Sequence, residues 1–148
     1  MDINLKEWQL IKTEQIEDDF EGFDDEMVYH LTDGTFYFQK NYKYSYHYSY
    51  RPNIRIFSNG FSTIMVVDGM NDYVEVEQTT GLVSRIINEF KGWSGDSIFE
   101  LQNGQIWKQD KYKYKYFYAH RPKATIVKIG SKHIMTVKGK SIRVKRIK

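Results

Sequence analysis

The sequence predicts an all-β protein made of two copies of one small antiparallel barrel. Residues 42–52 read Tyr-Lys-Tyr-Ser-Tyr-His-Tyr-Ser-Tyr-Arg-Pro, and residues 112–122 read Tyr-Lys-Tyr-Lys-Tyr-Phe-Tyr-Ala-His-Arg-Pro, so the chain repeats with an offset of 70 residues. In both segments tyrosine occupies every second position, which is the period of a β-strand. Asp33-Gly34 and Asn103-Gly104 each stand between apolar runs, and both dipeptides favour a β-hairpin of the type I′ class.

The repeat divides the 148 residues into an acidic copy 1 (residues 1–78), with an N-terminal extension, and a basic copy 2 (residues 79–148). Each repeating part is close to the lower size at which a domain buries a core of its own. An aromatic content of 16% favours folding at this size, because large rings bury much apolar area per residue. We therefore expect two small domains.

Copy 1 opens with residues 1–15, for which Trp8, Leu10 and Ile11 favour a leading strand. Between Glu14 and Glu26 the chain has eight acidic residues and no basic one. This segment is either a solvated surface with aromatic anchors or an acidic face that meets a basic partner. Further strands are expected at 28–31, 35–39, 42–50, 53–57, 63–67 and 73–77.

Copy 2 repeats this order, and its opening at residues 79–93 has two interpretations. Leu82, Val83, Ile86, Ile87 and Phe90 follow a helical spacing, which would make this the one short helix of the chain. The same segment matches the opening of copy 1 at the offset of 70, which would make it extended. The match continues without a gap to Gly139, after which copy 2 loses two residues.

The two copies share a scaffold and differ in charge. Identical pairs include Phe20/Phe90, Gly22/Gly92, Leu31/Leu101, Gln39/Gln109, four of the tyrosines and the Arg-Pro dipeptide. Residues 1–78 hold 6 basic and 15 acidic side chains, a balance of −9, whereas residues 79–148 hold 16 basic and 4 acidic ones, a balance of +12. Opposite charges of this size predict attraction between the copies, within one chain or head to tail between chains.

The shared pattern is Phe-x-Gly-Phe/Trp, then Leu-x-Asp/Asn-Gly-x-x-x-x-Gln, then the tyrosine strand with Arg-Pro, then Met-x-Val-x-Gly. It resembles SH3-like barrel repeats in small uncharacterised bacterial and phage proteins, and it covers nearly all of the chain from Ile16 to Ile147. The resemblance implies two SH3-like barrels with little helix. It also implies binding of peptides, proteins, nucleic acids or cell-wall material, among which the fold alone does not choose.

No catalytic or cofactor motif accompanies this scaffold. His30, His47, His120 and His133 lie in strand-like segments without a metal-ligand spacing, and the chain has no cysteine. The glycines stand singly at hairpins, so no phosphate-cradling loop is present. We expect a non-enzyme with no cofactor and no metal. The cysteine-free composition and the absence of an apolar membrane segment predict a soluble cytoplasmic protein.

The tyrosines are candidates for a binding surface. They either pack mainly within the barrel, with their hydroxyls at the rim, or form a partly exposed platform of the kind that stacks single-stranded nucleic acid. The expected partner is a protein, with the role of an adaptor or inhibitor; nucleic acid is the second candidate, through copy 2. In copy 2, Ile142 and Val144 are expected to point inward and Arg143 and Lys145 outward as a basic stripe. The candidate binding residues are Tyr44, Tyr46, Tyr48, Trp107, Lys108, Lys111, Lys113, Tyr114, Lys115, Tyr116, Arg121, Arg143, Lys145 and Arg146.

Overall fold

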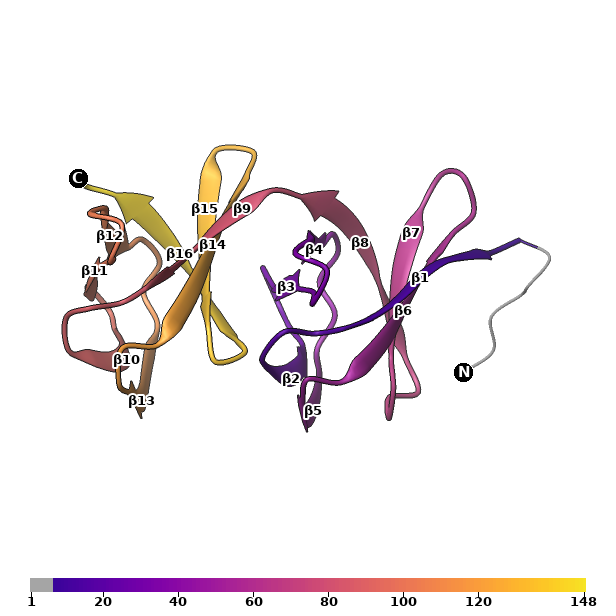
Figure 1. Ribbon diagram of the computed structural model, residues 1–148, viewed down its shortest axis with the longest axis horizontal. Helices are drawn as coiled ribbons and strands as arrows, with labels where there is room; N and C mark the ends of the chain where they lie inside the picture. Colours follow the sequence, from indigo (N-terminus) through magenta and orange to yellow (C-terminus); the bar gives the residue numbers. More distant parts are fainter. Residues whose placement is uncertain (1–6) are drawn as a thin grey trace. The chain divides into compact units, whose positions relative to one another are not determined.

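The structure is a computed structural model that describes residues 7–148, and its regular secondary structure there consists of β-strands joined by turns and loops. Sixteen strands follow one another, and no helix occurs among the described residues (Figure 1). The all-β prediction is therefore confirmed. No segment in this part of the chain is a helix long and apolar enough to cross a membrane.

The helical interpretation of residues 79–93 is wrong. Gly81–Arg85 forms strand β9, which pairs antiparallel with β14 (Lys123–Ile129), so that Leu82 lies opposite Ile126. Along β9 exposed residues alternate with partly buried ones, which is the period of a strand. Pairing with a strand some forty residues later overrides the local helical spacing.

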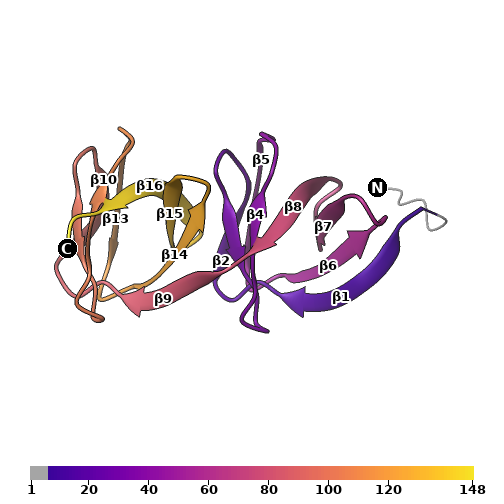
Figure 2. The ribbon, with the colours of Figure 1, turned by 90° about the horizontal axis from the view of Figure 1, so that it is seen from above.

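The chain folds as two compact units, Met1–Thr79 (unit 1) and Thr80–Lys148 (unit 2). Unit 1 has a six-stranded antiparallel sheet and a separate two-stranded one. The order of the large sheet is β1 (Gln9–Gln15), β6 (Asn53–Ser58), β7 (Thr63–Val67), β8 (Tyr73–Thr79), β4 (Phe36–Gln39) and β3 (Val28–His30). The small sheet pairs β2 (Asp19–Phe23) with β5 (Ser45–Tyr50) (Figure 2). The leading strand expected at 1–15 is present as β1; residues 1–6 lie outside the described part.

Unit 2 has the same strand order, with every strand in the equivalent place. Its large sheet runs β9, β14, β15 (Lys132–Val137), β16 (Lys140–Arg146), β12 (Ile106–Gln109) and β11 (Ile98–Glu100). Its small sheet pairs β10 (Phe90–Ser94) with β13 (Tyr114–Ala119). Isolated bridges Ile16–Leu31 and Ile86–Leu101 also fall 70 residues apart. Within residues 7–148 none of the four sheets closes on itself, so the expected closed barrels are not observed.

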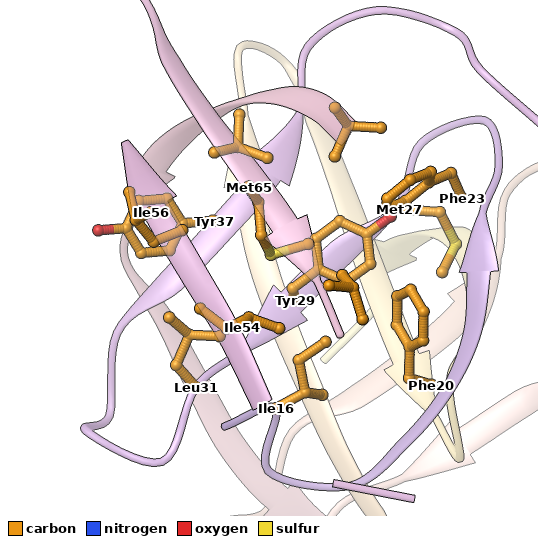
Figure 3. Close-up of a cluster of buried hydrophobic side chains, with 13 residues drawn as sticks. Ile16, Phe20, Phe23, Met27, Tyr29, Leu31, Tyr37, Ile54, Ile56 and Met65 are labelled. Carbon is orange, nitrogen blue, oxygen red and sulfur yellow. The ribbon is translucent and has the colours of Figure 1, made fainter. Parts of the chain in front are cut away.

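Each unit has its own hydrophobic core between its two sheets. In unit 1, Phe20 and Phe23 of the small sheet belong to one buried cluster with Ile54 and Ile56 of the large one (Figure 3). The core of unit 2 follows the same plan, and its members include Phe90, Trp93, Phe99, Leu101, Trp107, Ile126, Met135, Ile142 and Val144. Buried Ile142 and Val144 confirm the predicted inward face of β16.

Both predicted hairpins form, but their turns are not of type I′. That turn needs positive φ at both central residues, whereas here only Gly34 (φ 88°) and Gly104 (φ 92°) have it. The preceding Asp33 and Asn103 instead accept a hydrogen bond from the backbone N–H two residues later, at 3.0 and 2.9 Å. The acidic or amide side chain is thus used as an Asx-type turn residue.

Arg51 and Arg121, which both precede proline, turn each tyrosine strand back into the large sheet. Their φ angles are 49° and 45°, a left-handed conformation that costs free energy in any residue but glycine. The side chains of Gln15 and Arg85 donate to the carbonyls of Arg51 and Arg121, at 3.1 and 2.9 Å. Both copies therefore make the same left-handed turn at the Arg-Pro dipeptide, with its carbonyl bonded to a side chain of the large sheet.

Candidate functional site: two exposed tyrosine faces

The tyrosines of both repeats point into solvent. The five of unit 1 are 53–71% exposed, and we call them tyrosine face 1: Tyr42, Tyr44, Tyr46, Tyr48 and Tyr50. The four of unit 2 are 61–81% exposed and form tyrosine face 2: Tyr112, Tyr114, Tyr116 and Tyr118. Of the two interpretations of the tyrosine pattern, packing within the barrel is wrong and exposure is right. All five tyrosines among the candidate binding residues belong to these faces.

The residues between the tyrosines explain this orientation. Along β5 the serines and His47 are partly buried, while every tyrosine is exposed. In β13 the ring of Phe117 packs against Phe90 and Trp93, with ring centroids 5.1 and 5.0 Å apart. Successive side chains of a strand point to opposite faces, so the packing of Phe117 inward directs Tyr116 and Tyr118 outward.

Glycines in the partner strands let these strands approach the tyrosine strands closely. Gly22 and Gly92, with φ of 101° and 90°, lie opposite a β-bulge whose extra residue belongs to the tyrosine strand, β5 or β13. A Cβ atom at Gly92 would collide with the backbone oxygen of Lys115, and one at Gly22 with that of Ser45. Only glycine combines this φ with this close approach, which explains why both copies have it.

A buried glutamine anchors the segment that leads into each tyrosine strand. The side-chain amide of Gln109 donates to the carbonyls of Lys111 and Lys113 at 3.0 and 2.8 Å, and its oxygen accepts from Gly95 N–H at 3.0 Å. In unit 1, the Gln39 amide donates to the carbonyls of Asn41 and Lys43, at 2.8 and 3.2 Å. The Gln39 oxygen accepts from the hydroxyl of buried Tyr29 at 2.9 Å. Identity of this glutamine in both copies was the sequence signal for this role.

Tyrosine face 1 is lined by carboxylates of β2. The hydroxyl of Tyr48 donates to Asp19 Oδ1 at 2.7 Å. This hydrogen bond raises the pKa of Tyr48 to about 12, with smaller contributions from slight burial and from the charges of Asp19, Glu21 and Asp18. Three acidic residues of the Glu14–Glu26 segment, Asp18, Asp19 and Glu21, therefore lie close enough to act on Tyr48.

Tyrosine face 2 carries a different charge pattern. Glu89 and Lys91 take the places of Asp19 and Glu21, and they form an ion pair at 2.8 Å that raises the pKa of Lys91. Lys115 alternates with the tyrosines, so it lies on the opposite side of β13 from Tyr114 and Tyr116. The lysines interleaved in the sequence therefore do not all share one face with the tyrosines.

The predicted basic stripe lies on the large sheet of unit 2. Arg143 and Lys145 alternate with buried Ile142 and Val144, and the pairing of β12 with β16 places Lys145 opposite Lys108. Arg146 pairs with Trp107, one position further, and so belongs to the other face of the sheet. The stripe thus consists of Lys108, Arg143 and Lys145.

The remaining candidate residues have surroundings of their own. Trp107 is only 3% exposed and its indole N–H donates to Gln105 at 3.1 Å, so it is a core residue and not a surface contact. Lys111 and Lys113 are exposed in the segment anchored by Gln109. Arg121 is exposed at the left-handed turn.

A shallow cavity of about 380 Å³ in unit 2 was not predicted. Arg85 and Lys123, which are paired in neighbouring strands, contribute its two cationic side chains. The Arg85 side chain already donates to the Arg121 carbonyl. Its other lining residues are Val83, Ser84, Gln102 and Asn103.

Within residues 7–148 no group of three or more His, Cys, Asp or Glu side chains is placed to hold a metal ion. His30 stacks on Phe36 with ring centroids 4.4 Å apart, and His133 lies 5.0 Å from the ring of Trp107. These two histidines are packed against aromatic rings.

No protein-family model, curated protein or solved structure matches this chain.

Proposed function

We propose that the chain is a non-enzymatic binding module whose partner is a protein and whose contact surfaces are the two tyrosine faces. The observation that carries this proposal is the exposure of nine tyrosine side chains, each more than half accessible to solvent, along two short segments. Contiguous exposed aromatic area of this kind marks interaction sites. Tyrosine is enriched at protein interfaces, because its ring supplies large contact area at a low entropy cost and its hydroxyl remains hydrogen-bonded.

Preorganisation supports the same proposal. Gln39 and Gln109 hold the segments before the tyrosine strands, and Gly22 and Gly92 let the partner strands pair closely with the tyrosine strands. A rigid surface loses little conformational entropy when it binds, which favours affinity. The exposed rings are thus held ready for a partner.

We also propose that the two units are tandem copies of one SH3-like fold, as the sequence resemblance implies. The offset of 70 residues and the shared strand order support this relationship. Two copies with a common aromatic face and different flanking charges suit an adaptor that engages two chemically different surfaces.

Nucleic-acid binding through unit 2 is the second candidate. It is favoured by the basic stripe of Lys108, Arg143 and Lys145, which lie on one face of the large sheet. It ranks lower because Lys115 lies on the side of β13 opposite the tyrosines. A nucleic acid whose bases stack on the tyrosine rings would therefore not find the Lys115 charge on the same face of the strand.

Affinity capture with the full chain tests the proposal. The wild type, Tyr46→Ala/Tyr48→Ala and Tyr116→Ala/Tyr118→Ala would be compared with and without nuclease. Tyr73→Ala, which removes a 38% exposed tyrosine outside both faces, is the control. We expect the wild type and Tyr73→Ala to retain one stoichiometric protein after nuclease, and at least one double variant to lose it. Retention by both double variants would refute the tyrosine faces, and loss of all bound protein on nuclease treatment would favour nucleic acid.

A further inference from the structure

The two tyrosine faces differ in the charges that surround the same aromatic pattern. On face 1 the Tyr48 hydroxyl is bonded to Asp19, and the charges of Glu21 and Asp18 also act on it. On face 2 the equivalent acidic position, Glu89, is neutralised by Lys91 at 2.8 Å. A partner that recognises face 1 therefore meets tyrosine rings together with carboxylates.

The chain itself shows which group suits such a surface. The ammonium of Lys43 lies 2.8 Å from Asp72 and 4.9 Å from the centroid of the Tyr73 ring. The ammonium of Lys12 likewise lies 2.9 Å from Asp33 and 5.5 Å from the ring of Tyr37. A carboxylate and a tyrosine ring together hold a cation in both places, by an ion pair and a cation–π contact.

From this we propose that tyrosine face 1 binds an extended, lysine- or arginine-rich segment of a partner protein. The proposal rests on the protein-binding function above and names its partner chemistry. Charge complementarity selects the occupant, since the carboxylate of Asp19 bonds the Tyr48 hydroxyl and the charges of Asp18 and Glu21 act on the same ring.

The spacing of the rings fits an extended peptide. Alternate residues of a regular strand lie about 6.8 Å apart, at roughly 3.4 Å per residue. Tyr46, Tyr48 and Tyr50 alternate along β5, whose pairing with β2 shifts by one residue between Tyr46 and Ser49. Side chains on one face of an extended peptide repeat at the same distance. A segment with Lys or Arg at every second position therefore places one cation near each ring, with Asp19 and Glu21 within reach.

Fluorescence anisotropy with a labelled ten-residue peptide, in which Arg alternates with Ser, tests this directly. The full chain would be titrated at about 150 mM salt, with a peptide that alternates Glu with Ser as the reversed-charge probe. Asp19→Asn/Glu21→Gln removes carboxylates from face 1, and Tyr46→Ala/Tyr48→Ala removes rings. The matched controls are Glu77→Gln/Glu100→Gln, two exposed glutamates outside the tyrosine faces, and Tyr116→Ala/Tyr118→Ala on face 2.

We expect the Arg peptide to bind and the Glu peptide not to bind. Each face 1 variant should weaken binding of the Arg peptide about tenfold, and both controls should leave it within about twofold. Equal affinity of Asp19→Asn/Glu21→Gln and wild type, or no binding by the wild type, would overturn the inference.

Two further outcomes separate this inference from the general function. If affinity capture still depends on Tyr46 and Tyr48 but is unchanged by Asp19→Asn/Glu21→Gln, the protein-binding function stands and the cationic partner is refuted. If light scattering shows a concentration-dependent increase in mass that Asp19→Asn/Glu21→Gln abolishes, the occupant is the basic unit of a second copy. That result would overturn the assignment to a separate partner.

Discussion

The side-chain amide of Gln109 donates a hydrogen bond to the backbone carbonyl of Lys113 at 2.8 Å, and Gln39 makes the same bond to Lys43 at 3.2 Å. Each glutamine is buried and lies at the end of a strand in the large sheet. Each bond reaches the segment from which the tyrosine strand begins. A buried glutamine thus positions the segment that leads into each tyrosine strand. A substitution at this glutamine is therefore expected to affect the exposed tyrosine face as well as the core.

Replacing Gln109 with methionine should destabilise unit 2 by about 2–4 kcal/mol. The change keeps the volume but removes bonds to the carbonyls of Lys111 and Lys113 and to the N–H of Gly95, leaving buried polar groups without partners. Chemical denaturation of the full chain measures the effect. Exposed Gln102→Met is the control and should change the free energy of unfolding by less than about 0.5 kcal/mol. Equal effects of the two substitutions would show that Gln109 is no anchor.

Gly92→Ala should be much more destabilising than Gly104→Ala. Both glycines have nearly the same φ, 90° and 92°, so both substitutions strain the backbone by roughly 1–3 kcal/mol. A Cβ atom at Gly104 meets nothing within 4 Å, whereas one at Gly92 meets the Lys115 oxygen and the Phe117 ring. We expect Gly92→Ala to lower the thermal midpoint further or to prevent folding of unit 2. Similar midpoints for the two variants would mean that the bulge tolerates a side chain.

Trp93→Phe should change stability by less than about 1.5 kcal/mol, as expected for a swap of one large apolar ring for another. Trp93 is 1% exposed and its indole N–H has no hydrogen-bond partner within residues 7–148, so phenylalanine removes an unsatisfied donor while losing some packing. Unit 1 has Phe23 at the equivalent position, where it meets Phe20 edge to face as Trp93 meets Phe90. Trp93→Ala should cost about 3–5 kcal/mol. Equilibrium unfolding distinguishes the two, and a cost for Trp93→Phe that equals that of Trp93→Ala would contradict the expectation.

Acid should weaken unit 2 through His133. Burial lowers the pKa of His133 below its ordinary value of 6.5, and the charge of Lys128 lowers it further. The unfolded chain then binds the proton more readily than the folded one, so stability falls as the pH drops from about 6.5 through the lower folded pKa, and is unaffected above 6.5. Thermal midpoints between about pH 8 and pH 5 measure this. Unit 1 has threonine at the equivalent position, so His133→Thr is the matched substitution. It should remove the part of the pH dependence of the thermal midpoint that is due to His133. An unchanged pH profile in this variant would assign the effect to other groups.

The sequence by itself determined the parts of the fold that depend on local patterns. Alternation predicted strands, and with them an all-β protein; Asp-Gly and Asn-Gly predicted both hairpins; the burial of Ile142 and Val144 followed from the same period. Identity of Gln39 and Gln109 indicated a shared role without showing what that role was. These features could be predicted because they arise from residues close together in the chain.

Tertiary structure decided the other features of the fold and the site, because those features depend on contacts between residues that are distant in the sequence. A period of two places the tyrosines on one face but does not say which face is covered; the packing of Phe117 on Phe90 and Trp93 determines that in unit 2. Leu82 became part of a strand because Ile126 lies opposite it in β14. Asp19 joins tyrosine face 1 because β2 pairs with β5 across an intervening hairpin, which brings its carboxylate to the Tyr48 hydroxyl 29 residues later.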